Sequence, residues 1–184
     1  MGVVITVTGP SGSGKSTLIH RIMEKYPDVY GEAISHTTRK PRPGEVHGKD
    51  YIFVNEEEFD QMVENEEFLE TVTFAGRRYG SAFSEARLKT EKGHALVVVE
   101  PHGKEQWQEN WGGTVLSVFL DVNEETCCER MAMAGRDAAD IQKRIMHDRP
   151  IFNVDRSEYD LCLANRNLEA ACESLVQFVE HKTR

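Results

Sequence analysis

A glycine-rich segment near the start of the chain has the composition of a phosphate-binding loop. Residues 9–16, GPSGSGKS, match the pattern G-x-x-x-x-G-K-[ST] between an apolar run and a helical pattern. Backbone N–H groups in such a loop converge on phosphate oxygens, and the helix N-terminus adds partial positive charge. We predict that Lys15 contacts the β- and γ-phosphates of ATP and that Ser16 binds Mg²⁺. The predicted ATP-binding set is Gly9, Ser11, Gly12, Ser13, Gly14, Lys15, Ser16 and Thr17, together with Arg130.

A second segment, residues 35–45, concentrates phosphate-binding side chains in an otherwise acidic protein. Its sequence, SHTTRKPRPGE, holds four hydroxyl or imidazole side chains and three cations. Arg39 and Arg42 lie three residues apart, so two guanidinium groups converge on one phosphate if the loop turns between them. A generic basic loop is the alternative, and a glycine loop alone does not separate a kinase from a hydrolase or a GTP switch.

The order and spacing of these segments resemble the guanylate kinase family. The matching pieces are residues 9–17, 35–54, 68–70 (FLE) and 79–81 (YGS), and weaker similarity continues through 130–144 and 159–165. The resemblance implies phosphoryl transfer from ATP to GMP or dGMP. It implies that Arg39, Arg42, Tyr51 and Tyr79 bind the acceptor's phosphate and that Ser35, Glu70 and Ser81 recognise its base, with Glu45 and Glu100 also in the acceptor site.

Glu70 carries most of the predicted base specificity. Guanine presents N1–H and N2–H₂ donors beside the O6 acceptor, which suits a carboxylate next to a hydroxyl. A buried carboxylate that faced the N1 lone pair of adenine would stay unpaired, and sites built on hydrogen bonds reject such analogues by factors as large as ~10⁴. The alternative is a surface glutamate at the end of the acidic stretch 56–70. Tyr51 and Tyr79 have their own alternative, as core aromatic residues with hydroxyls at the surface.

Phosphoryl transfer needs positioning and neutralisation of charge, so we predict no enzyme nucleophile. The predicted catalytic residues are Lys15, Arg39, Arg136 and Arg144. Arg136 and Arg144 lie in a predicted flap at 135–154, whose closure would exclude water, and Arg130 lies at its base. The alternative is a solvated helix face on which these arginines pair with Asp137 and Asp140. Arg149 lies beyond the matching spacing and fits either role.

Three positions depart from the family pattern. An Asp-x-Asp pair usually ends the central strand, whereas this chain has Val98 and Glu100, and Ala134 stands where a flap arginine is expected. These differences keep a second hypothesis open, a kinase of other or several (deoxy)nucleoside monophosphates, including modified purines. A noncatalytic module that binds phosphorylated partners is a third, which the complete glycine-lysine loop disfavours.

Apolar runs at 3–7, 95–99, 115–120 and, more weakly, 159–164 alternate with helical patterns at 16–26, 103–111, 123–133 and 168–181. The runs lack polar alternation, as expected for strands covered on both faces. We predict an α/β fold of the P-loop type: a parallel sheet flanked by helices, with an inserted lobe of mixed β/α structure and a lid. Within one domain, 1–184, we assign 1–30, 91–134 and 155–184 to the core, 31–90 to the lobe and 135–154 to the lid.

Composition limits the possible partners. The chain has 184 residues with Lys+Arg 22 and Asp+Glu 31, a net charge of −9, which opposes nonspecific binding to nucleic acid or anionic lipid. We expect no nucleic-acid or membrane partner, and a cytoplasmic monomer or homodimer whose partners are ATP and GMP or dGMP. Four cysteines without zinc or disulfide spacing predict buried free thiols.

Overall fold

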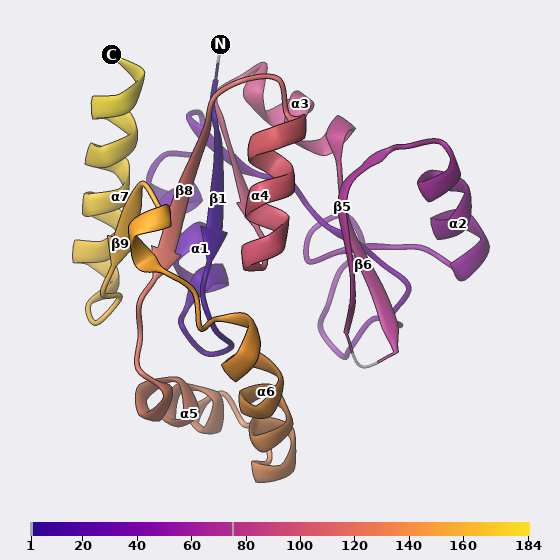
Figure 1. The fold of residues 1–184 in the computed structure, drawn as a ribbon, viewed down its shortest axis with the longest axis vertical. Helices are drawn as coiled ribbons and strands as arrows, with labels where there is room; N and C mark the ends of the chain where they lie inside the picture. The colour runs from indigo at the N-terminus through magenta and orange to yellow at the C-terminus, as the bar shows by residue number, and fades with distance from the viewer. Residues whose placement is uncertain (1, 75) are drawn as a thin grey trace.

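A five-stranded sheet forms the centre of the protein (Figure 1), in a computed structural model that describes residues 2–74 and 76–184. Every neighbouring pair of strands is parallel, which confirms the predicted α/β class. The expected run at 159–164 contributes only three strand residues. In their order across the sheet the strands are β2 (Tyr30–Glu32), β7 (His94–Val98), β1 (Val4–Thr8), β8 (Val115–Leu120) and β9 (Leu161–Leu163).

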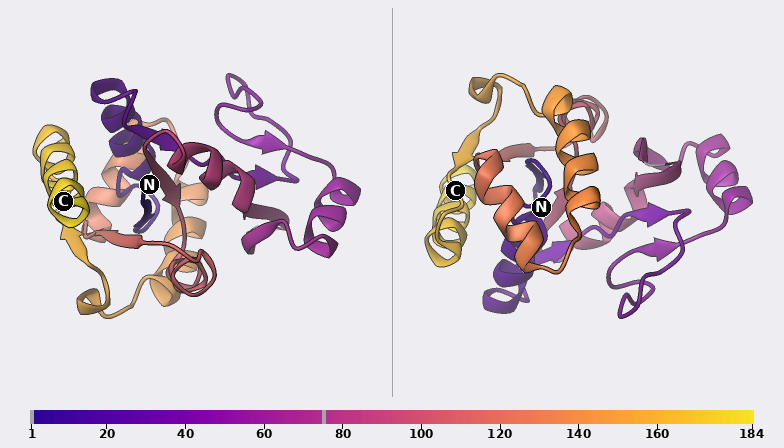
Figure 2. Two further views of the ribbon diagram at one scale, coloured as in Figure 1. Left: turned by 90° about the horizontal axis from the view of Figure 1, so that it is seen from above. Right: turned by 90° about the horizontal axis from the view of Figure 1, so that it is seen from below.

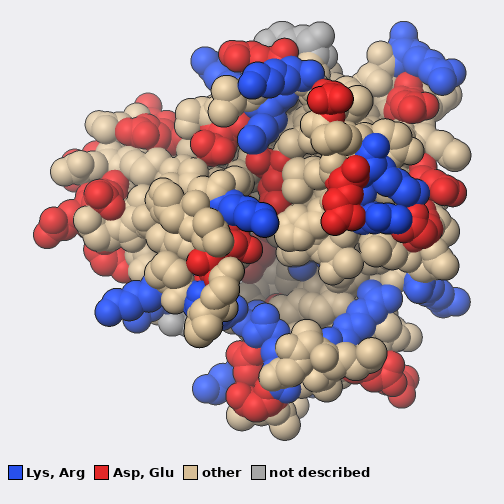
Figure 3. All heavy atoms as spheres, turned by 180° about the vertical axis from the view of Figure 1, so that it is seen from behind, with Lys and Arg blue, Asp and Glu red and all other residues tan. Residues whose placement is uncertain are grey.

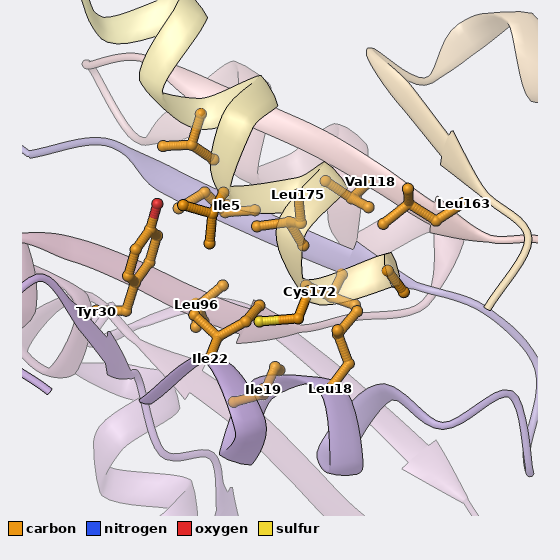
Figure 4. Packing of buried hydrophobic residues seen from close by; sticks show 14 of the residues in the cluster. Ile5, Leu18, Ile19, Ile22, Tyr30, Leu96, Val118, Leu163, Cys172 and Leu175 are labelled. Carbon is orange, nitrogen blue, oxygen red and sulfur yellow. The ribbon is translucent and has the colours of Figure 1, made fainter. Parts of the chain in front are cut away.

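Helices cover both faces of this sheet, so its strands are apolar on both sides. Successive residues of β1 point to opposite faces. Ile5 packs in one cluster with α1 (Lys15–Lys25) and α7 (Leu168–Thr183), whereas Val4 packs in another with Trp107 of α4 (Pro101–Asn110). Figure 4 shows the first cluster, in which Leu18, Ile19 and Ile22 of α1 meet Cys172 and Leu175 of α7 against Ile5 and Leu96.

Each expected helix is present with small shifts at its ends. α4 (Pro101–Asn110) begins two residues before the predicted start, because proline at the first helical position has a suitable φ and no N–H to leave unpaired. The other predicted helices correspond to α1, α5 (Glu124–Met133) and α7.

Residues between β2 and β7 build a second sheet beside the first, with the order β4-β3-β6-β5. α2 (Glu56–Glu64) covers it, and its Phe59 ring lies 4.6 Å from the Phe68 ring, centroid to centroid. This lobe projects from the side of the core (Figure 1). α3 (Phe83–Thr90) leads back to β7, and the lobe strands are β3 (His36–Thr37), β4 (Ile52–Phe53), β5 (Phe68–Phe74) and β6 (Arg77–Ala82). The predicted core segment ended at residue 30, but β2 pairs with β7 of the core sheet through Glu32. The division into core and lobe stays a prediction.

The segment predicted as a flap is mostly one helix, α6 (Ala138–Ile151). Gly135, with φ 79°, makes the turn between α5 and α6, and the 3₁₀ helix η1 (Arg156–Glu158) precedes β9. The two helices lie side by side beyond the carboxyl ends of β1 and β8 (Figures 1 and 2). The crevice at the carboxyl ends of parallel strands is where α/β proteins bind ligands.

The four cysteines are free thiols, but the expectation that all are buried is wrong. Cys127 and Cys172 are buried, Cys128 is half-buried and Cys162 is exposed. Cys162 is the middle residue of the edge strand β9, and its side chain points to the opposite side from the half-buried Leu161 and the buried Leu163, which leaves the thiol exposed. Across residues 2–74 and 76–184, no helix has the length and apolar character to cross a membrane.

Candidate active site

The glycine-rich loop turns tightly between β1 and α1. Gly14 caps α1 with a left-handed backbone, φ 94°, which a residue with a side chain rarely adopts. Gly12 has φ 80°, and a Cβ built on it would lie 2.5 Å from the carbonyl oxygen of Cys127. Glycine is therefore required at both positions, for backbone conformation and for space.

Lys15 begins α1 and reaches back across the loop. Its Nζ donates to the carbonyl oxygens of Gly9, at 2.5 Å, and Pro10, at 3.1 Å. Burial lowers the pKa of Lys15 to about 8, and the nearby Asp148 carboxylate opposes that shift. At neutral pH the ammonium group remains mostly charged, as phosphate binding requires.

Arg130 supports the loop from behind. Its guanidinium donates to the carbonyl oxygen of Ser13 at 3.1 Å and to that of Asn165 at 2.6 Å. The Asn165 side chain donates to the same Ser13 oxygen at 2.9 Å. These contacts join α5 and the end of β9 to the loop, and an ATP contact for Arg130 stays a prediction.

A cavity of about 440 Å³ extends from the loop to the lobe and to α6. The space-filling view shows a hollow with basic side chains at its edge (Figure 3). Ser11, Lys15 and Ser16 of the predicted ATP set line it, whereas Gly9, Gly12, Ser13, Gly14, Thr17 and Arg130 do not. All the residues predicted for the acceptor line it: Ser35, Arg39, Arg42, Glu45, Tyr51, Glu70, Tyr79, Ser81 and Glu100.

One end of the acceptor wall is organised around Arg39. Its two terminal nitrogens donate to the Glu45 carboxylate at 2.8 and 2.9 Å, and its guanidinium carbon lies 5.2 Å from the Tyr51 ring centroid. Glu45 also accepts from the backbone N–H of Arg42 at 2.7 Å, which turns the loop between the two arginines. The Tyr51 and Tyr79 rings lie 5.9 Å apart, so aromatic hydroxyls and guanidinium groups share this wall.

The other end holds Glu70 and Ser81, which the β5–β6 ladder pairs directly across the strands. Ser81 Oγ donates to Glu70 Oε1 at 2.9 Å. Glu70 is only 9% exposed, and its pKa is raised to about 7, chiefly by burial; the Ser81 hydrogen bond opposes this shift and the Glu100 carboxylate contributes to it. The buried Glu70 carboxylate and the Ser81 hydroxyl thus lie side by side. This burial excludes the alternative that Glu70 is a surface glutamate.

Arg136 and Arg144 both line the cavity from the α6 side. They also share one carboxylate, because Arg136 donates to Asp140 at 2.9 Å and Arg144 donates to it at 3.1 Å. The predicted pairing with Asp140 is therefore present, while Asp137 caps the start of α6. Arg149 instead pairs with Glu124, 2.7 Å away on the exposed side of α6.

Sequence reasoning did not identify several cavity residues. Asp148 of α6 accepts a hydrogen bond from the Ser11 backbone N–H at 2.6 Å, and the Phe74 ring of β5 lies 4.5 Å from the ring of His147. Glu32 of β2 also faces the cavity. The only sequence signal near Asp148 was the basic flap that contains it. Its contact with Ser11 could not be predicted, because the two residues lie 137 positions apart in the chain.

Two of the three positions that depart from the family pattern lie in the cavity wall. Val98 and Glu100 line the cavity at the end of β7, and burial raises the pKa of Glu100. Ala134 ends α5, two residues before Arg136, which does reach the cavity.

A parallel sheet with a glycine-lysine loop at its carboxyl edge, an inserted lobe and a helical flap is the organisation of a P-loop nucleoside monophosphate kinase. The family model described as guanylate kinase matches residues 1–182. This match covers nearly the whole chain, and curated guanylate kinases are more than 30% identical to it. The chain therefore belongs to the guanylate kinase family, a family of phosphotransferases.

Two curated relatives illustrate the match. A guanylate kinase of Streptomyces kasugaensis is 34% identical over 171 residues, which cover 92% of this chain and 83% of that protein. A guanylate kinase of Trichodesmium erythraeum is 32% identical over 182 residues, covering 98% and 97%. The crystal structure of guanylate kinase from Anaplasma phagocytophilum has the same fold, with a TM-score of 0.73 at 24% identity over 98% of this chain and 86% of that one.

Proposed function

We propose that this protein transfers the γ-phosphate of ATP to the phosphate of GMP and of dGMP. One observation carries the proposal: a single cavity joins the phosphate-binding loop at Lys15 to the buried Glu70–Ser81 pair by way of Arg39. A nucleoside monophosphate whose base meets Glu70 thus has its phosphate directed toward the loop. Membership of the guanylate kinase family supports the same assignment.

At the acceptor end, Glu70 accepts from guanine N1–H and N2–H₂, and Ser81 adds a hydroxyl beside it. Arg39, held flat by Glu45 and Tyr51, presents a planar fork to the acceptor phosphate, with Arg42 at the open side. Adenine would leave the Glu70 carboxylate unpaired, which disfavours AMP.

At the donor end, the loop amides and Lys15 hold the ATP phosphates. The Ser16 hydroxyl and the Glu100 carboxylate line the same cavity, and such oxygen donors together with phosphates suit Mg²⁺. When bound, Mg²⁺ neutralises charge on the β- and γ-phosphates.

In the transfer step an oxygen of the acceptor phosphate attacks the γ-phosphorus, a new O–P bond forms, and the bond to the bridging oxygen of ADP breaks. Lys15, Arg136 and Arg144 stabilise the charge that spreads over the migrating group. Approach of the lobe and α6 excludes water, which suppresses hydrolysis of ATP. The reaction takes place where ATP is abundant, so cytoplasmic residence, as a monomer or homodimer, is part of the proposal.

The test is ADP formation from Mg-ATP with GMP, dGMP, AMP, dAMP, CMP, dCMP, UMP and dTMP as acceptors. We expect turnover with the guanine nucleotides, a loss of about 10²-fold or more in Glu70→Gln, and loss of turnover in Lys15→Ala. Glu64→Gln, an exposed change on α2, is the matched control for Glu70→Gln.

Each other outcome has a distinct meaning. Turnover with a different acceptor and none with guanine would replace the substrate assignment, with Val98 and Glu100 as the sites of changed specificity. Silence with every acceptor, combined with binding of GMP, would favour a noncatalytic module.

A further inference from the structure

We propose that Gly103 is a positioning residue that sets the depth of the Glu70 carboxylate and thereby the selection of the acceptor base. This inference rests on the proposed function, since it deepens the role of Glu70. Gly103 lies in the first turn of α4 and is not among the residues that line the cavity.

The observation is a close approach between two elements. A Cβ built on Gly103 would lie 2.2 Å from Glu70 Oε2 and 2.9 Å from its Cδ, and real Cβ contacts are essentially never under 3.0 Å. The carboxylate therefore rests directly on the bare Cα of α4. Gly103 has a helical backbone, so space and not conformation is the reason for glycine here.

Glycine at position 103 destabilises α4 relative to alanine, and the close approach of Glu70 is the reason it is nevertheless present. Within a helix it is less favourable than alanine by up to about 1 kcal/mol. The other glycines of the core and the glycine-rich loop serve turns and strands, whereas Gly103 is inside a helix and faces the Glu70 carboxylate.

The Glu70 carboxylate has little freedom to move away. Its Oε1 accepts from Ser81 Oγ at 2.9 Å, and Oε2 faces Gly103. The neighbouring Leu69 packs in one buried cluster with Trp107, which ties β5 to α4 just beside the contact. A methyl group at position 103 would push the carboxylate toward the cavity and break the Ser81 hydrogen bond.

The central experiment compares Gly103→Ala, Glu70→Asp and the double variant in steady-state assays with GMP and Mg-ATP. We expect Gly103→Ala to raise the KM for GMP by about 10- to 100-fold, the effect of a misplaced hydrogen bond to a charged group. The KM for ATP and kcat change little, because base binding is equal in the ground and transition states. Gln108→Ala, an exposed change to alanine in the same helix, is the control.

Rescue separates positioning from a general structural defect. Glu70→Asp shortens the side chain by one methylene and alone weakens GMP binding, but it makes room for the alanine at 103. The double variant should bind GMP better than the product of the two single losses predicts. Losses that simply multiply, or a Gly103→Ala enzyme that matches Gln108→Ala in its KM for GMP, would overturn the inference.

A stability readout covers the case in which Gly103→Ala folds poorly. Thermal unfolding should show a larger drop for Gly103→Ala in the native background than in a Glu70→Ala background, where the clashing carboxylate is absent and only the 3.2 Å approach to Val99 Cβ remains. Equal drops in both backgrounds would overturn the inference. If the native enzyme ignores GMP, the proposed function fails and this inference fails with it; normal GMP turnover with no effect of Gly103→Ala refutes only the inference.

Discussion

Two glutamates on the cavity wall have opposite protonation behaviour although they are the same residue type. Hydrogen bonds from Arg39 hold the pKa of Glu45 below its usual value, whereas burial raises that of Glu70 to about 7. Glu45 therefore serves as the fixed anion that orients a guanidinium. Hydrogen bonds from a bound ligand would favour the ionised form of Glu70, as the proposed recognition of a base requires.

Glu32 gives a residue-scale prediction for stability. Burial raises its pKa to about 7, with Asp50 adding to the shift and Lys89 opposing it. The folded state then binds more protons than the unfolded state between pH 4.5 and about 7, so Glu32 makes the protein less stable as the pH rises through this window. We expect Glu32→Gln to increase the free energy of unfolding by on the order of 1–3 kcal/mol at pH 8.

The measurement is denaturant unfolding at pH 5 and pH 8, with Glu64→Gln on the exposed face of α2 as the control. The gain from Glu32→Gln should shrink toward pH 5, where the native side chain is already protonated. An equal gain at both pH values would contradict this account.

At the scale of elements, α6 places a cation and an anion on the same wall of the cavity. Arg144 faces it, and Asp148 accepts from the Ser11 N–H at 2.6 Å, an amide of the kind that binds phosphate oxygens. A carboxylate at this amide competes with the phosphates of ATP. We expect Asp148→Ala to lower the KM for ATP by up to about tenfold, with the KM for GMP unchanged.

Steady-state kinetics with varied Mg-ATP at saturating GMP test this prediction, and Asp155→Ala, an exposed change beyond α6, is the control. A higher KM for ATP in Asp148→Ala would show instead that the carboxylate assists the bound nucleotide.

At the scale of the whole molecule, the lobe and α6 meet over the cavity. The Phe74 ring packs edge-on against His147, with centroids 4.5 Å apart, and lies 5.7 Å from the Arg144 guanidinium carbon. This contact joins the wall proposed for the acceptor to the wall proposed for the donor. Aromatic pairs of this geometry contribute about 0.5–1.5 kcal/mol.

We therefore expect Phe74→Ala to raise the KM values for both GMP and ATP by about 2- to 10-fold, because closure serves both substrates. Val63→Ala, an exposed apolar change elsewhere in the lobe, should have no effect. A change confined to one substrate would indicate a direct contact and not closure.

Local patterns in the sequence determined four strands of the core sheet, four helices and the glycine-lysine loop, because each depends on neighbouring residues and on which faces are apolar. The long ordered match also determined the family, and the residues it assigned to the acceptor all line one cavity. Tertiary structure alone decided the burial of Glu70, the close approach of Gly103 and the Asp148–Ser11 hydrogen bond. These properties depend on packing between segments 33 to 137 residues apart, which no local pattern records.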